Sequence, residues 1–247
     1  FLKNAASRNR MQESFFTVLG AMPFILHGAA ITISTVLCAM LLGLILGVPM
    51  AVGQVYGGPV ARRVISLYVW FFRGVPILVL LYLFYFGLVY QLNPLAFTLA
   101  GQEIVINVDL SPFTASCIVL GLTSAAYQSQ IFRGAINALP AGQLKAARAL
   151  GMPDSVSIVS IILPQALRLS IPGWSNEYSI LLKDSALVSV LGTMELMSRT
   201  KAIATSTAEY SAFYLTAALL YFCITILGVR CLRWAEKTFR IPGYTHL

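Results

Sequence analysis

Two carboxylates and an amide interrupt an apolar stretch in the last third of the chain. Residues 165–191 are mostly apolar, yet they include Asn176, Glu177 and Asp184. An ionisable residue inside a membrane span is costly, so each such residue is a candidate for a functional site. Glu177 and Asp184 are seven residues apart, about two helical turns, which places them on one face of a helix. Glu177 either holds a ligand or pairs with a basic residue such as Arg73, and Asp184 either joins that site or is solvated near the helix end.

Further polar residues stand in two other apolar stretches. Thr123, Tyr127 and Gln130 are spaced i, i+4 and i+7, so they form one stripe on a helix. Such a stripe either makes hydrogen bonds between helices or lines a ligand site. The Arg-Gly-x-Pro sequence at 73–76 can break a helix and free backbone groups for a carboxylate. The alternative is a proline kink that leaves Arg73 at an interface.

A short, basic, alanine-rich segment at 141–168 separates two apolar stretches. Gln143 to Leu150 are good helix formers, and Gly151 follows them at a position suited to a left-handed cap. Pro153 is placed to open a second helix, with Asp154 near its positive end. The segment therefore predicts two short helices joined by a tight turn.

The second short helix has a line of apolar residues spaced three or four apart, which predicts a face that packs on the rest of the protein: Val156, Val159, Ile162 and Leu163. Ala146 and Ala147 are expected at the tip of the protrusion, where small side chains allow a partner backbone to approach closely. The alternative is an amphipathic helix that rests on the membrane surface.

Composition places the chain in a membrane. Of its 247 residues, 58% are hydrophobic and 11% are charged, whereas soluble domains have about 25% charged residues. The formal net charge of +8 is dispersed at segment ends, which fits membrane topology and excludes nucleic acid as the expected partner. The sequence has no HExxH or GxSxG motif, and no GxxxxGK[ST] motif for ATP hydrolysis, so we expect no enzymatic activity.

A bilayer core needs about 20 apolar helical residues. By this measure the chain forms one transmembrane domain, 1–247, with five predicted spans: 24–52, 64–90, 111–135, 165–191 and 209–233. No internal repeat is visible, although many secondary transporters consist of inverted repeats.

Basic residues are distributed unevenly between the two sides of this topology. The side with fewer basic residues includes the 91–111 connection, which has no Lys or Arg, and the basic N-terminal segment. Its basic residues are Lys3, Arg8, Arg10, Lys183, Arg199 and Lys201. The richer side comprises Arg62, Arg63, Arg133, Lys145, Arg148, Arg168, Arg230, Arg233, Lys237 and Arg240. The positive-inside rule then predicts an outside N-terminus and a cytoplasmic C-terminus.

Motif spacing adds a resemblance to a known family. Lys145-Ala146-Ala147, then Gly151, then Ile161-x-Leu163-Pro164 is similar to the loop of ABC importer permeases that runs Glu-Ala-Ala, three residues, Gly, nine residues, Ile-x-Leu-Pro. The stretches FFRGVPILVLLYLFYFG (71–87), AAYQSQIFRGAINALPAGQ (125–143) and NEYSILLKDSALVSV (176–190) resemble the polar amino acid subfamily, and the likeness covers about 24–236.

The resemblance implies an all-α, polytopic type I importer permease with cytoplasmic coupling helices at 141–164. It implies two ATPase subunits that use ATP and Mg, a second permease subunit, similar or identical, and an extracytoplasmic solute-binding protein. This chain itself is expected to hold no cofactor and no metal. The expected location is a bacterial inner membrane.

The same resemblance assigns roles to residues. ATPase coupling falls to Lys145, Ala146, Ala147, Arg148, Gly151, Leu163 and Pro164. Lys145 replaces the family's Glu, so either an ion pair with the ATPase is lost or the ATPase carries a complementary acid. Gln130 likewise stands where many relatives have Glu.

Substrate contact is assigned by resemblance to Glu177, Asn176, Tyr127, Gln130, Arg73 and Asp184. In members that carry cationic amino acids, the position after the Asn of this motif faces the central cavity, so the resemblance implies that Glu177 binds a substrate ammonium or guanidinium group. The chain is therefore expected to translocate polar, cationic amino acids, such as arginine, lysine, histidine or an opine-like derivative, by alternating access. The alternative is an ion-coupled secondary amino acid carrier, in which the 141–164 loop would bind no ATPase.

Overall fold

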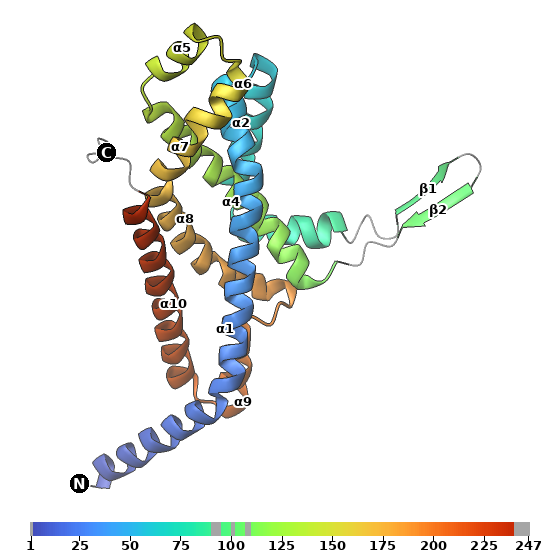
Figure 1. Cartoon of the computed structure of the whole chain (residues 1–247). Helices are drawn as coiled ribbons and strands as arrows, with labels where there is room; N and C mark the ends of the chain where they lie inside the picture. The colour runs from blue at the N-terminus through green and yellow to red at the C-terminus, as the bar shows by residue number, and fades with distance from the viewer. Residues whose placement is uncertain (1, 90–94, 100–101, 107–109, 240–247) are drawn as a thin grey trace. The chain divides into compact units, whose positions relative to one another are not determined.

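The protein is helical, and one short antiparallel hairpin interrupts the helices (Figure 1). The computed structural model describes residues 2–89, 95–99, 102–106 and 110–239, with side chains for 13–88 and 110–239. The elements are α1 (Leu2–Tyr56), α2 (Pro59–Gly74), α3 (Ile77–Tyr82), η1 (Leu83–Val89), β1 (Leu95–Leu99), β2 (Gln102–Ile106), α4 (Pro112–Ala138), α5 (Gly142–Ala149), α6 (Asp154–Ser157), η2 (Ile158–Ile162), α7 (Leu163–Leu169), α8 (Ile171–Asp184), η3 (Ser185–Leu191), α9 (Leu196–Thr207) and α10 (Tyr210–Thr238). The predicted helical fold class is confirmed.

The chain divides into two compact units. The first unit comprises Phe1–Leu37, Ile77–Val119 and Leu182–Thr225, and the second comprises Cys38–Pro76, Leu120–Leu181 and Ile226–Leu247. Four long helices, α1, α4, α8 and α10, contribute residues to both units. Each unit has its own packed core.

In the described part of the chain, two helices are long and apolar enough to cross a membrane by themselves: α1 over Glu13–Tyr56, and α10. Two further pairs of helices are each bent at a short break, and the number rises to four if each pair is one span. These pairs are α2 with α3–η1, and α6–α7 with α8–η3. The segments predicted at 24–52, 64–90, 165–191 and 209–233 fall on these elements, except that residue 90 lies outside the described residues. The fifth predicted span, 111–135, falls on α4, and the five-span topology stays a prediction.

Helix α4 is long enough to span a bilayer, since its 27 residues extend about 40 Å. It does not have the apolarity of the other candidates because hydroxyl and amide side chains occur along it. Five of these side chains are buried and at most 7% exposed: Ser116, Thr123, Ser124, Gln128 and Ser129. Polar residues packed against other helices satisfy their hydrogen bonds inside the protein, so α4 is built as an interior helix.

Two proline-containing breaks shape the other helices. Helix α2 ends at Gly74, and Val75 adopts an extended conformation (φ −94°, ψ 132°) because a residue before proline avoids helical angles. The break predicted at 73–76 is therefore present. A second break at Ser170, where Pro172 follows in the first turn of α8, bends the helical path by 55°.

The core of each unit joins distant parts of the chain. In the second unit, Phe132 and Ile136 of α4 pack against Ala51 of α1 and against Ile162 and Ala166 of the later helices. In the first unit, a separate cluster draws on α1, α9 and α10: Val18, Ile25, Ala29, Leu196, Ala204 and Phe213. Strands β1 and β2 pair from Leu95↔Ile106 to Leu99↔Gln102, within a connection for which no secondary structure was predicted.

Candidate functional site

The strongest candidate from the sequence, Glu177, is a buried carboxylate between two helices. Its side chain projects from α8 and is 3% exposed. Its Oε1 accepts a 2.8 Å hydrogen bond from the hydroxyl of Ser124 on α4, which is fully buried. The neighbouring Asn176 is exposed. Glu177 therefore lies at the α4–α8 contact of the second unit.

Ser124 belongs to a chain of buried hydrogen bonds. Its Oγ accepts from Gln128 Nε2 at 3.0 Å, and the same amide nitrogen donates to the backbone oxygen of Met40 on α1 at 3.0 Å. Trp174 Nε1 on α8 donates to Gln128 Oε1 at 2.7 Å. The chain thus connects α1, α4 and α8 around Glu177.

Neither Ser124 nor Gln128 stood out in the sequence, where the neighbouring stripe of Thr123, Tyr127 and Gln130 was preferred. The signal that could have revealed them is a pair of glycines on α1. A Cβ at Gly43 would collide with the Gln128 amide nitrogen, and a Cβ at Gly47 would lie 3.1 Å from the Cβ of Gln128. Two small residues four apart allow close helix approach, and the side chain opposite them is then buried.

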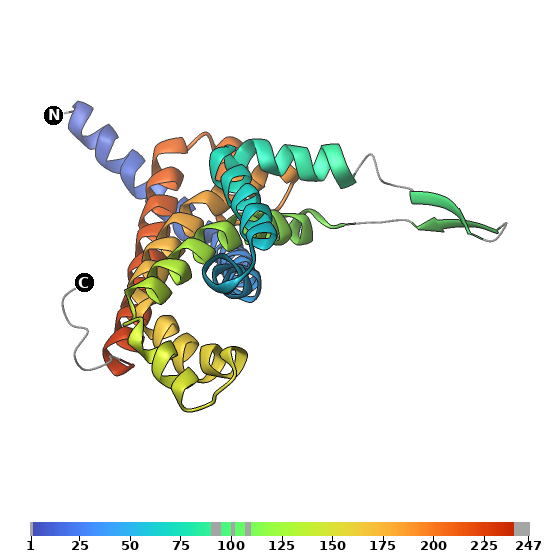
Figure 2. The ribbon, with the colours of Figure 1, turned by 90° about the horizontal axis from the view of Figure 1, so that it is seen from above.

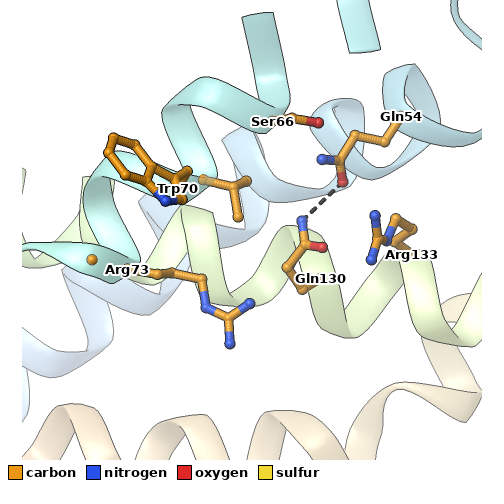
Figure 3. Close-up of a pocket in the computed structure, with 8 residues that line it drawn as sticks. Gln54, Ser66, Trp70, Arg73, Gln130 and Arg133 are labelled. Atoms are coloured by element: carbon orange, nitrogen blue, oxygen red, sulfur yellow. Dashed lines mark hydrogen bonds between the residues drawn. The ribbon is translucent and has the colours of Figure 1, made fainter. Parts of the chain in front are cut away.

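A pocket of about 390 Å³ lies between α1, α2 and α4 (Figure 3). Its lining is Gln54, Ser66, Val69, Trp70, Arg73, Gly74, Gln130 and Arg133. Gln130 Nε2 donates to Gln54 Oε1 at 2.8 Å, and Figure 3 shows these two side chains facing each other. The three helices therefore place two arginines and two amides around one space.

The pocket is electropositive. The Arg73 guanidinium lies over the ring of Tyr127, 4.9 Å from its centroid. Within the described residues, neither Arg73 nor Arg133 has a carboxylate within salt-bridge distance. Guanidinium groups match carboxylates well, so this pocket suits an anionic group.

The predicted substrate residues thus separate into groups. Arg73, Tyr127 and Gln130 come together at or beside the pocket. Glu177 is held at Ser124, four residues before Gln128 on α4. Asp184 is half-buried and belongs to the first unit.

The segment at 141–164 forms the two predicted short helices, α5 and α6, which lie side by side (Figure 1, Figure 2). Gly151 has a positive φ of 77°, and the predicted left-handed cap is confirmed. Gly151 N–H donates to Arg148 O at 2.9 Å and Met152 N–H donates to Ala147 O at 3.0 Å, the bond pair of a Schellman cap. Pro153 precedes α6, and Asp154 lies in its first turn as predicted.

Two side-chain pairs fasten this loop. Arg148 Nε and Nη2 donate to the two carboxylate oxygens of Asp154, both at 2.7 Å. These hydrogen bonds hold the pKa of the Asp154 carboxyl below its ordinary value. Gln143 and Gln165 exchange two amide hydrogen bonds of 2.9 Å, which tie α5 to α7. Arg148 is therefore occupied within the loop, whereas Lys145 is exposed and has no such partner among the described residues.

Two expectations for the loop were wrong. Ala147 is not at the tip: it is 3% exposed and packs inside, while Ala146 is exposed and Leu150, at 83%, is the most exposed apolar side chain here. Val156 and Val159 are exposed as well. Ile162 is buried as predicted, but its buried neighbours at four-residue steps are Ile158 and Ala166, not the two valines. Leu163 packs against that core as expected, and Pro164 is exposed in the first turn of α7.

A second buried carboxylate, Glu195, lies in the first unit and was not singled out in the sequence. It is fully buried and caps α9, accepting from Met197 N–H at 2.8 Å and Ser198 N–H at 2.7 Å. Tyr221 of α10 and Thr32 of α1 also donate to it, at 2.9 and 3.3 Å. Burial raises the pKa of this carboxyl above its ordinary value. Glu195 therefore fastens three helices together.

Comparison with known proteins identifies the fold and the family. Residues 39–241 match the family described as binding-protein-dependent transport system inner membrane component. The crystal structure of an amino acid ABC transporter with histidines superposes with a TM-score of 0.76 and 30% identity, covering 91% of this chain and 98% of that one. The MetNI methionine ABC transporter in inward-facing form superposes with a TM-score of 0.64 at 19% identity, which shows the same fold.

Curated relatives cover the same length. The octopine transport system permease protein OccQ of Rhizobium radiobacter is 36% identical over 85% of this chain and 88% of its own. The arginine ABC transporter permease protein ArtQ of Escherichia coli is 38% identical over 81% of this chain and 88% of its own. The chain therefore belongs to the binding-protein-dependent inner membrane components, as a multi-pass permease subunit of the polar amino acid ABC importers and not as the ATPase subunit.

Proposed function

We propose that this permease translocates cationic amino acids or opine-like derivatives, with Glu177 receiving the cationic group and the Arg73 pocket receiving a carboxylate. Relatives named for octopine and arginine support a solute of this kind. The observation that carries the proposal is that α4 contacts both a buried carboxylate and an arginine-lined pocket. Ser124, which holds Glu177, and Gln130, which lines the pocket, are six residues apart, about 9 Å along α4.

That separation is on the scale of an extended amino acid. Such a solute presents a positive group at one end and a carboxylate at the other, so Glu177 on α8 and the arginines on α2 and α4 would orient it. Tyr127 and Gln130 add polar contacts between the two ends, and Asn176 is exposed beside Glu177. Asp184, two turns further along α8, would meet the solute at another stage of the passage.

Energy comes from partner subunits in this proposal. Two ATPases that use ATP and Mg dock on the 141–164 loop, a second permease, similar or identical, completes the pathway, and a solute-binding protein delivers substrate from outside. The N-terminus lies outside and the C-terminus lies in the cytoplasm. Alternating access then exposes the Glu177 region to each side of the membrane in turn.

The loop also predicts the chemistry of its docking groove. Arg148 is neutralised by Asp154, so Lys145 is the charge that the α5 surface offers to a partner. Leu150 adds an exposed apolar side chain at the turn. We propose that the ATPase groove carries an acidic residue opposite Lys145 and an apolar recess for Leu150.

Glu177→Gln tests the proposed charge recognition. The importer, reconstituted with its ATPase and binding protein, is assayed for binding of labelled arginine and of citrulline, an analogue with an uncharged side chain. Losing a buried charge contact costs about 1.5–3 kcal/mol, so we expect arginine affinity to fall about 10- to 100-fold while citrulline affinity changes little. Glu236→Gln, a carboxylate on α10, is the matched control. An unchanged arginine-to-citrulline preference in Glu177→Gln would assign Glu177 a structural role.

A further inference from the structure

The hydrogen bonds around Gln128 run in one direction only. Trp174 Nε1 is a donor and cannot accept, so the atom that it meets at 2.7 Å must be the amide oxygen of Gln128. The backbone oxygen of Met40 is an acceptor and cannot donate, so the amide nitrogen of Gln128 must face it. A flipped amide would face a donor with a donor and an acceptor with an acceptor. The two neighbours therefore fix the orientation of this amide.

The fixed amide determines what Ser124 does. The Gln128 nitrogen has a second hydrogen, which it donates to Ser124 Oγ at 3.0 Å. The single hydroxyl proton of Ser124 is then directed to Glu177 Oε1 at 2.8 Å. The hydroxyl therefore points its proton at this oxygen and holds the Glu177 carboxylate in place from the α4 side.

The helix packing protects this arrangement. Ser124 and Gln128 have no exposed surface, and Trp174 packs against the core of the second unit. Gly43 leaves the space that the Gln128 amide occupies. A polar network in which every member is satisfied, inside a packed core, is rigid and polarises each hydrogen bond along its length.

We infer that Gln128 and Ser124 are positioning residues that set the direction of the Glu177 carboxylate for cationic solutes. This inference rests on the proposed function of Glu177. Met40 and Trp174 select the amide orientation, the amide selects the direction of the hydroxyl, and the hydroxyl fixes the carboxylate. A carboxylate fixed before binding loses less freedom when the solute arrives, so the chain increases affinity for a cation in particular.

The experiment uses the complete importer in nanodiscs and measures equilibrium dissociation constants for labelled L-arginine and L-citrulline. Gln128→Glu keeps the shape of the side chain but removes the donor to Ser124. Ser124→Ala removes the proton donor to Glu177, and Ser124→Cys keeps a weak one. We expect the arginine-to-citrulline preference to fall at least fivefold in Gln128→Glu and Ser124→Ala, with Ser124→Cys between Ser124→Ala and the wild type.

Two further results separate this inference from the proposed function. In a Glu177→Gln background, Ser124→Ala should leave the preference where Glu177→Gln alone puts it, because the hydroxyl acts through that carboxylate. If Glu177→Gln lowers the preference but Ser124→Ala and Gln128→Glu keep the wild-type value, the positioning role is refuted and the proposed function stands. If Glu177→Gln itself changes nothing, the proposed function fails first. A general loss of packing would weaken both ligands equally, which would also contradict the inference.

Discussion

At the scale of single residues, the chemistry was visible in the sequence wherever a residue was rare for its surroundings. Glu177 and Arg73 stand out because ionisable groups are costly in apolar segments. Ser124 and Gln128 did not, because hydroxyls and amides are common in such helices and their importance depends on which side is buried. That side is set by the approach of α1 to α4, a tertiary contact between residues far apart in the chain.

Gly43→Ala tests the close approach directly. The added Cβ would overlap the amide nitrogen of Gln128, so that side chain must shift and the core becomes overpacked. Overpacking costs about 1–3 kcal/mol, and we expect a lower melting temperature of the purified permease together with a weaker arginine preference. Gly20→Ala on the same helix is the control, because nothing lies within 4 Å of the new Cβ. Equal effects of the two substitutions would show that Gly43 provides no essential space.

Glu195→Ala tests the second buried carboxylate. The change leaves the N–H groups of Met197 and Ser198 and the hydroxyl of Tyr221 without their acceptor, and removes the cap of α9. Each buried donor left unsatisfied costs about 1–3 kcal/mol, so we expect unfolding to require about 2–4 kcal/mol less. Thermal unfolding of the detergent-solubilised permease measures this, with Lys201→Ala on the exposed side of α9 as control. A melting temperature within one degree or so of the wild type would contradict the fastening role.

At the scale of elements, turn chemistry was predicted well and helix faces less well. Gly151 and Pro153 fix the turn between α5 and α6 by their own backbone preferences, so its cap followed from local sequence. The buried face of the second helix did not, because the segment offers two apolar lines and only the position of the α4 core selects between them. The hairpin β1–β2 likewise lacked a strong local signal.

Gly151→Ala separates backbone strain from steric effects in this loop. No atom lies within 4 Å of a Cβ at position 151, so the whole cost comes from placing alanine at φ 77°. A left-handed residue with a Cβ costs about 1–2 kcal/mol, which loosens the turn that holds α5. We expect a several-fold drop in substrate-stimulated ATP hydrolysis by the assembled importer. Gly142→Ala, equally free of neighbours but without a positive φ, should retain wild-type stimulation; equal losses in both variants would contradict the strain argument.

At the scale of the whole molecule, the number of spans depends on α4. Its length suffices to cross the membrane, but its buried polar side chains lower its apolarity below that of the other candidates, of which the described chain has up to four. Hydropathy measures average composition and cannot distinguish polar atoms facing lipid from polar atoms facing other helices. The hydrogen bonds of Ser124 and Gln128 to neighbouring helices show the second case. This favours α4 as a span enclosed by protein.

A chain with four spans and a chain with five spans differ in the sides of the membrane on which their termini lie. With five spans the termini lie on opposite sides of the membrane, and with four they lie on the same side. Ten basic residues on one side against six on the other predict a cytoplasmic C-terminus and an outside N-terminus. A fluorescent protein that matures only in the cytoplasm should therefore be bright when fused after Leu247, and alkaline phosphatase, active only outside, should be active when fused before Phe1. Fusions that report both termini in the cytoplasm would remove α4 from the membrane-crossing helices and reverse the assignment of every loop before it. The outcome therefore also decides whether Glu177 and the Arg73 pocket, which α4 holds together, lie at bilayer depth.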